Sequence, residues 1–196
     1  MKKWITAFLA GLLLCTGCSV EKTESESSSS QAQEISSVKE EQKASAVVYF
    51  SATGNTEKIA EKMAGILNAD LYEIVPSETY TDEDLNYNDN SCRANQEMND
   101  ENARPEIQND LSDVENYDTV YLGYPIWWGT APRIIDTFLE TYDLTDKNVY
   151  VFCTSGSSGI ENGMKDLSKK VNIIDGRRFE TDTTDNAIEE WLKSLK

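Results

Sequence analysis

The chain has 196 residues, enough for one domain, and carries 18 lysines and arginines against 35 aspartates and glutamates, a formal net charge of −17. Such an acidic chain is not expected to bind nucleic acid, because proteins hold the phosphate backbone through lysine and arginine. It contains no histidine, which excludes Ser-His-Asp and Cys-His catalysis and the commonest zinc ligand sets.

The first residues have the pattern of a targeting segment. Two lysines precede an apolar run over 4–14, which is shorter than the roughly 20 apolar residues of a membrane-spanning helix. The run ends in Leu-Cys-Thr-Gly-Cys, which resembles a bacterial lipobox whose last cysteine, here Cys18, is lipidated. Cys15 stands where that motif usually has leucine. We favour a lipoprotein signal peptide over 1–17 rather than a secretory signal that is cut elsewhere, because polar residues follow Cys18 directly.

Residues 18–43 are predicted to form a disordered tether. They are rich in serine, glutamate, glutamine and lysine and almost without apolar residues, so they cannot bury enough surface to offset the entropy of ordering. With lipid on Cys18, we expect the protein to be anchored to the outer face of the bacterial cell membrane and therefore to be extracytoplasmic.

The folded domain is predicted over 44–196, and its elements alternate between strand and helix. Strands are expected at 47–50, 71–75, 119–124 and 149–153, with a weaker one near 173–174 or 178–180. Helices are expected at 59–67, 132–142, 160–171 and 186–195. This alternation predicts an α/β fold with a doubly wound, five-stranded parallel sheet in the order 2-1-3-4-5.

The stretch over 77–118 is long for one crossover between strands. It is acidic, rich in asparagine, and has a helical pattern over 91–101. We favour a crossover helix with extended loops. The alternative is that part of this stretch folds over the ligand site.

Ligands of such sheets bind beyond the carboxyl ends of the strands, where the winding reverses. Three segments with unusual sequences are expected to meet there, and the first is Ser-Ala-Thr-Gly-Asn-Thr over 51–56. It offers hydroxyls, an amide and a glycine suited to a tight turn: Ser51, Thr53, Thr56, Asn55 and Gly54. The helix that follows has unpaired N–H groups that attract anions. Without a lysine or a G-x-G-x-x-G pattern, the segment predicts a phosphate site of neutral donors, or, as the alternative, a helix cap at Thr53 or Asn55.

The second segment contains two adjacent tryptophans in a loop: Pro125, Ile126, Trp127, Trp128 and Gly129. Their side chains point different ways, so one is expected to pack on the sheet and the other to lie flat against a planar ligand. The third segment is a small, hydroxyl-rich loop that contains Thr154, Ser155 and Gly156. The two cysteines of the folded part, Cys92 and Cys153, are expected to be free thiols.

These segments resemble those of flavodoxins. The strand over 47–50 with the loop over 51–56 looks like the family's FMN-phosphate loop, and the P-I-W-W-G sequence resembles a loop of one flavodoxin-like family. The resemblance implies that FMN is the cofactor, that Trp128 stacks on its isoalloxazine ring, and that the 154–156 loop contacts the ring edge. Flavodoxins often place an aromatic residue in that last loop, and this chain has none. One ring face is therefore expected to be open or to be covered by Tyr80 or Tyr87.

The resemblance implies an FMN-binding protein that transfers electrons, because the flavin carries the redox chemistry. We expect its partner to be a redox protein or a membrane quinol. The alternatives are an FMN-dependent oxidoreductase acting on quinones or similar acceptors, which an open ring face would favour, and a lipoprotein binding module that has lost flavin.

Overall fold

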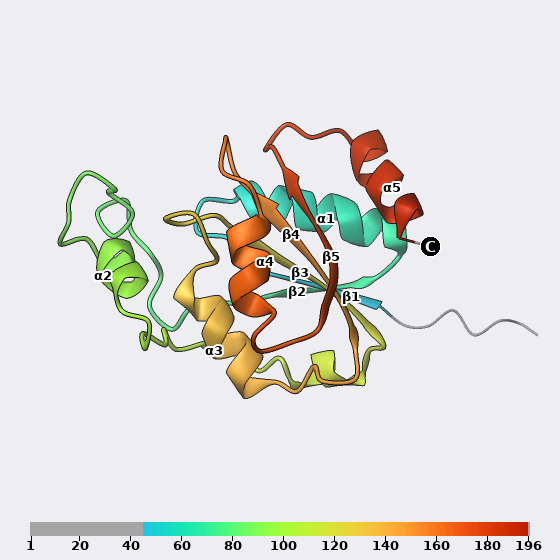
Figure 1. Cartoon of the computed structure of the whole chain (residues 1–196), viewed down its shortest axis with the longest axis horizontal. Coiled ribbons are helices and arrows are strands. Elements are labelled where there is room, and N and C mark those ends of the chain that lie inside the picture. The colour runs from blue at the N-terminus through green and yellow to red at the C-terminus, as the bar shows by residue number, and fades with distance from the viewer. Residues whose placement is uncertain (1–44, 196) are drawn as a thin grey trace, which may run out of the picture. The chain divides into compact units, whose positions relative to one another are not determined.

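Five parallel strands form one sheet in the order β2-β1-β3-β4-β5 (Figure 1). The computed structural model describes residues 45–195, so the predicted signal peptide, the tether and Cys18 lie outside the described residues. The strands are β1 (Ser45–Tyr49), β2 (Asp70–Glu73), β3 (Thr119–Pro125), β4 (Asn148–Thr154) and β5 (Ile173–Phe179). The predicted α/β fold and strand order are confirmed.

The three middle strands are apolar without interruption because both faces of the sheet are covered. In β1, β3 and β4 successive residues are buried, and Val48 of β1 lies opposite Leu122 of β3, which lies opposite Val151 of β4. Gly123 allows the ring of its partner Phe152 to cross the strand, since a Cβ there would lie 2.2 Å from the ring. This packing fixes the strand ends that carry the candidate site.

Helices cover the sheet in two groups, each with its own apolar cluster (Figure 1). On one face lie α1 (Asn55–Leu67) and α5 (Asp185–Ser194). On the other face lie α3 (Arg133–Thr141) and α4 (Glu161–Leu167), with α2 (Arg93–Asn99) on the long segment over 77–118. Within residues 45–195, no helix has both the length and the apolar character needed to cross a bilayer.

Two predicted boundaries were wrong in instructive ways. The fifth strand runs from the first weak candidate into the second and ends at Phe179. It contains Asp175 and two arginines, which are tolerated because an edge strand has one side in solvent. Helix α4 ends at Leu167 rather than at 171, since Lys169 and Lys170 donate backbone hydrogen bonds three residues back and the chain tightens into turns.

The segment over 77–118 is attached to the sheet through Tyr80. Its buried ring packs edge-on against Phe50 and Trp127, with ring centroids 5.8 and 5.1 Å apart. Its hydroxyl donates a 2.6 Å hydrogen bond to Glu97 of α2, and the Arg93 guanidinium lies 4.1 Å from the ring centroid. Burial and Glu97 raise the pKa of Tyr80 well above its ordinary value, so the phenol stays protonated as a donor.

Candidate functional site

The three predicted loops meet at the carboxyl edge of the sheet around a cavity of about 180 Å³. None of the lining side chains is formally charged at neutral pH, although the chain as a whole carries a net charge of −17. The lining residues are Ala52, Thr53, Asn55, Leu85, Tyr87, Pro125, Ile126, Trp127, Thr154, Ser155, Gly156 and Thr181.

The structure separates the predicted site residues into two sets. Those that line the cavity are Thr53, Asn55, Pro125, Ile126, Trp127, Thr154, Ser155 and Gly156. Those that belong to the same loops but do not line it are Ser51, Gly54, Thr56, Trp128 and Gly129. The second set shapes the loops or lies at the rim, as the contacts below show.

The first loop has the geometry of an anion site. Gly54 has a φ of 75° and is the N-cap of α1, so the chain turns sharply and directs the free N–H groups of the helix outward. The Ser51 hydroxyl is buried and has no hydrogen-bond partner among the described residues. A buried hydroxyl without a partner costs about 1–3 kcal/mol, so Ser51 is a donor available to a phosphate in this loop.

The Thr56 side chain does not line the cavity. Its hydroxyl is fully buried and shares a 2.8 Å hydrogen bond with the Thr154 hydroxyl. This bond joins the first turn of α1 to the end of β4 and so holds the first and third loops together. Thr56 therefore positions the site from beneath, and only Thr154 of the two reaches the cavity.

The two tryptophans lie on a tight turn. Trp127 and Thr130 exchange backbone hydrogen bonds of 2.9 and 3.0 Å, and both central residues have positive φ, 47° at Trp128 and 84° at Gly129. Positive φ at both positions defines a type I′ turn. It is ordinary for glycine but costs on the order of 1–3 kcal/mol for a bulky residue such as tryptophan. Strain of this kind concentrates at binding sites.

The turn gives the two rings the different environments that the sequence predicts. Trp127 is 3 % exposed and packs edge-on against Phe50 and Tyr80. Trp128 is 41 % exposed at the rim of the cavity, where its ring centroid lies 4.8 Å from that of Tyr87. Trp128 and Tyr87, which is 56 % exposed, are therefore the two accessible aromatic side chains at the site.

The segment over 77–118 contributes directly to the site. Leu85 and Tyr87 line the cavity, so part of the segment reaches the site, as the alternative interpretation expected, and the crossover helix that we favoured is present as α2. Of the two tyrosines proposed as covers, Tyr80 is buried beneath Trp127 and Tyr87 lies at the cavity. Thr181 was missed as well, although its place just after β5 was a usable signal because β4 and β5 end side by side.

The third loop is held by contacts of its own and by hydrogen bonds to the end of β5. The Ser155 hydroxyl accepts hydrogen bonds from the backbone N–H groups of Ser157 and Ser158, at 3.3 and 2.9 Å. Cys153, just before the loop, is fully buried, and burial raises the pKa of its thiol to about 12. Cys92 is buried at the start of α2, and both cysteines are free thiols, as predicted.

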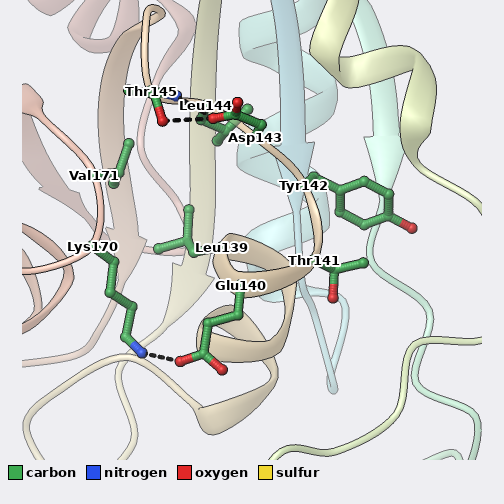
Figure 2. A pocket seen from close by; sticks show the side chains of 9 residues that line it. All are labelled: Leu139, Glu140, Thr141, Tyr142, Asp143, Leu144, Thr145, Lys170 and Val171. Atoms are coloured by element: carbon green, nitrogen blue, oxygen red, sulfur yellow. Dashed lines mark hydrogen bonds and ion pairs between the residues drawn. The ribbon is translucent and has the colours of Figure 1, made fainter.

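A second cavity, of about 270 Å³, lies between the end of α3 and the turns that precede β5 (Figure 2). Its charged groups already have partners: Lys170 pairs with Glu140, and Asp143 accepts hydrogen bonds from Thr145 (Figure 2). Arg104 and Lys170 lower the pKa of Glu140 to about 2. The charged side chains of this cavity are thus engaged with neighbouring residues. Within residues 45–195 there is also no cluster of acidic and cysteine side chains suited to a metal ion.

Comparisons with known proteins agree with this fold. A family model described as flavodoxin matches residues 44–195. A candidate flavoprotein from Bacteroides eggerthii is 42 % identical, with a TM-score of 0.74 over 78 % of this chain and 98 % of its own. A flavoprotein from Lactobacillus acidophilus, solved in complex with FMN, is 27 % identical, with a TM-score of 0.60 over 76 % of this chain and 99 % of its own.

A more distant likeness exists to an uncharacterized protein of Methanocaldococcus jannaschii. The two chains are 29 % identical over 102 residues, which is 52 % of this chain and 47 % of the relative. This chain thus matches about half the length of that curated relative.

Proposed function

Because this chain belongs to the flavodoxin family and its cofactor is FMN, we propose that it is an electron-transfer flavoprotein held at the outer face of the cell membrane. The observation that carries the proposal is the uncharged cavity at the carboxyl edge of the sheet, with an anion loop at one end and an exposed tryptophan at its rim.

The residues of the site fit FMN. The loop over 51–56 would hold the phosphate through Ser51 and the N–H groups at the start of α1. Trp128 would offer a flat surface to the ring, while Ser155 and Gly156 would bring backbone groups to its edge. Bound FMN supplies the capacity to accept and release one or two electrons. The chain binds and orients it and keeps formal charges out of its immediate surroundings.

The charge distribution supports transfer to a partner protein with a basic face. The segment over 77–118, which reaches the cavity, contains thirteen acidic residues and two basic ones. An acidic surface beside a redox centre speeds the approach of a basic partner and selects against acidic ones. A membrane quinol is the other electron donor that we consider.

Reduction of the FMN-loaded protein by light distinguishes one-electron transfer from two-electron chemistry. We expect the spectrum of a one-electron-reduced flavin to accumulate before full reduction. Direct conversion to fully reduced flavin would instead favour an FMN-dependent oxidoreductase of quinones or similar acceptors. The exposed face of Trp128, and a third loop without an aromatic residue, favour this second candidate function.

Membrane attachment through Cys18 has a direct test in a bacterial host. We expect the full chain to sediment with membranes and to enter a detergent phase, whereas Cys18→Ser is released into the aqueous phase, because an acyl anchor supplies about 0.8 kcal/mol per buried CH₂. Metabolic labelling with a fatty acid should mark only the unsubstituted chain. Equal partitioning of the two proteins would contradict a lipid anchor at this residue.

A further inference from the structure

Arg178 lies directly behind the third loop of the cavity. From the end of β5, its Nη1 donates a 2.8 Å hydrogen bond to the Ser155 carbonyl oxygen, and its Nη2 lies 3.1 Å from a carboxylate oxygen of Glu180. Its side chain is 31 % exposed. The guanidinium is thus partly shielded from water. It lies behind the Ser155 peptide group, which separates it from the cavity.

The contact completes the hydrogen bonding of Ser155. The Ser155 N–H donates to the Phe179 carbonyl at 3.2 Å, and its hydroxyl accepts from the two N–H groups that follow in the loop. Its carbonyl oxygen is bonded to Arg178. Because Ser155 and Gly156 line the cavity, Arg178 fixes the orientation of the peptide that faces the ligand.

Arg178 is also a charge in an unusual place. Within residues 45–195 it is the one cation that hydrogen-bonds to a residue lining the cavity, and no lining side chain is formally charged. Its field extends beyond Ser155, since it lowers the pKa of the Cys153 thiol against the larger effect of burial. Glu180 offsets part of this charge.

We propose that Arg178 positions the flavin-facing peptide at Ser155 and sets the reduction potential of the bound flavin. This inference rests on the proposed function. A bound FMN would supply a ring that is neutral when oxidised and carries one negative charge after the uptake of two electrons and one proton. A cation held behind the cavity wall stabilises that form more than the neutral oxidised ring, so it raises the potential. The adjacent Glu180 acts in the opposite direction.

The test measures the two-electron potential and the FMN affinity of the full chain, by equilibration with a reference dye under a chemical reductant. Arg178→Gln should lower the preference for reduced over oxidised FMN about fivefold, which is about 20 mV for a two-electron couple. Glu180→Gln should raise the potential by a similar amount. Arg177→Gln is the matched control, because it removes the same charge from the exposed neighbouring residue and should cause a much smaller shift.

Each outcome bears on a separate part of the proposal. Arg178→Lys keeps the charge but loses the planar two-sided contact, so it should retain most of the potential while binding oxidised FMN more weakly. Equal weakening of oxidised and reduced FMN in Arg178→Gln, with no shift in Glu180→Gln, would reduce Arg178 to a structural role and overturn the proposal. Failure of the unsubstituted chain to bind FMN would instead contradict the proposed function itself.

Discussion

Replacing Trp127 with alanine is expected to lower the free energy of unfolding by about 3–5 kcal/mol, as for other buried aromatic residues. Trp127 is 3 % exposed and packs against Phe50 and Tyr80, so its loss opens a cavity beneath the site. The same replacement at Trp128 should change stability by less than about 1 kcal/mol, because that ring is 41 % exposed and its contact is with the exposed Tyr87.

FMN affinity should instead fall more in Trp128→Ala than in Trp127→Ala. Trp128→Ala should weaken FMN binding about tenfold, because it removes the larger of the two accessible aromatic rings. Chemical denaturation of the two FMN-free proteins, followed by FMN titration of the folded variants, separates these effects. A large loss of stability in Trp128→Ala with unchanged FMN affinity would contradict the roles assigned to the two rings.

Ser51→Ala is expected to weaken FMN binding at least tenfold, since a hydrogen bond to a charged group contributes about 1.5–3 kcal/mol. The same change should leave the stability of the FMN-free protein unchanged or slightly raised, because the buried hydroxyl has no partner to lose among the described residues. If Ser51 had only a structural role, the substitution would lower the stability of the FMN-free protein and leave FMN affinity unchanged.

Riboflavin provides the control for Ser51, because it has the flavin ring but no phosphate. Titration of the unsubstituted and Ser51→Ala proteins with both ligands should show the loss for FMN and no difference for riboflavin. An equal loss for the two ligands would place Ser51 at the ring and contradict the phosphate loop.

The strand order was predictable from the sequence because each middle strand is a continuous apolar run bounded by a polar loop or a proline. Elements without such a run were harder to predict from the sequence. The fifth strand is an edge strand and mixes Asp175, Arg177 and Arg178 with apolar residues, so period and burial give little signal. Helix α4 ends where the chain tightens into turns after Leu167. The sequence has no capping residue there from which this end could be predicted.

The sequence was sufficient to predict which three loops form the site. It was less informative about the individual contacts between their residues. Gly54 and the paired tryptophans are unusual enough to mark their loops. The partner of Thr56 was not predictable, since it is 98 residues distant, and neither was the approach of Tyr87 to Trp128 from a long acidic segment. Contacts between distant segments depend on how the sheet brings their ends together.

The central claim is most directly tested by titrating the purified, FMN-free full chain with FMN while recording flavin absorption and tryptophan fluorescence. We predict one FMN per chain, sharpened flavin bands, and quenching of tryptophan fluorescence that requires about tenfold more FMN in Trp128→Ala. A well-folded chain that binds no FMN and shows no quenching would contradict the account and would favour a lipoprotein module that has lost its flavin.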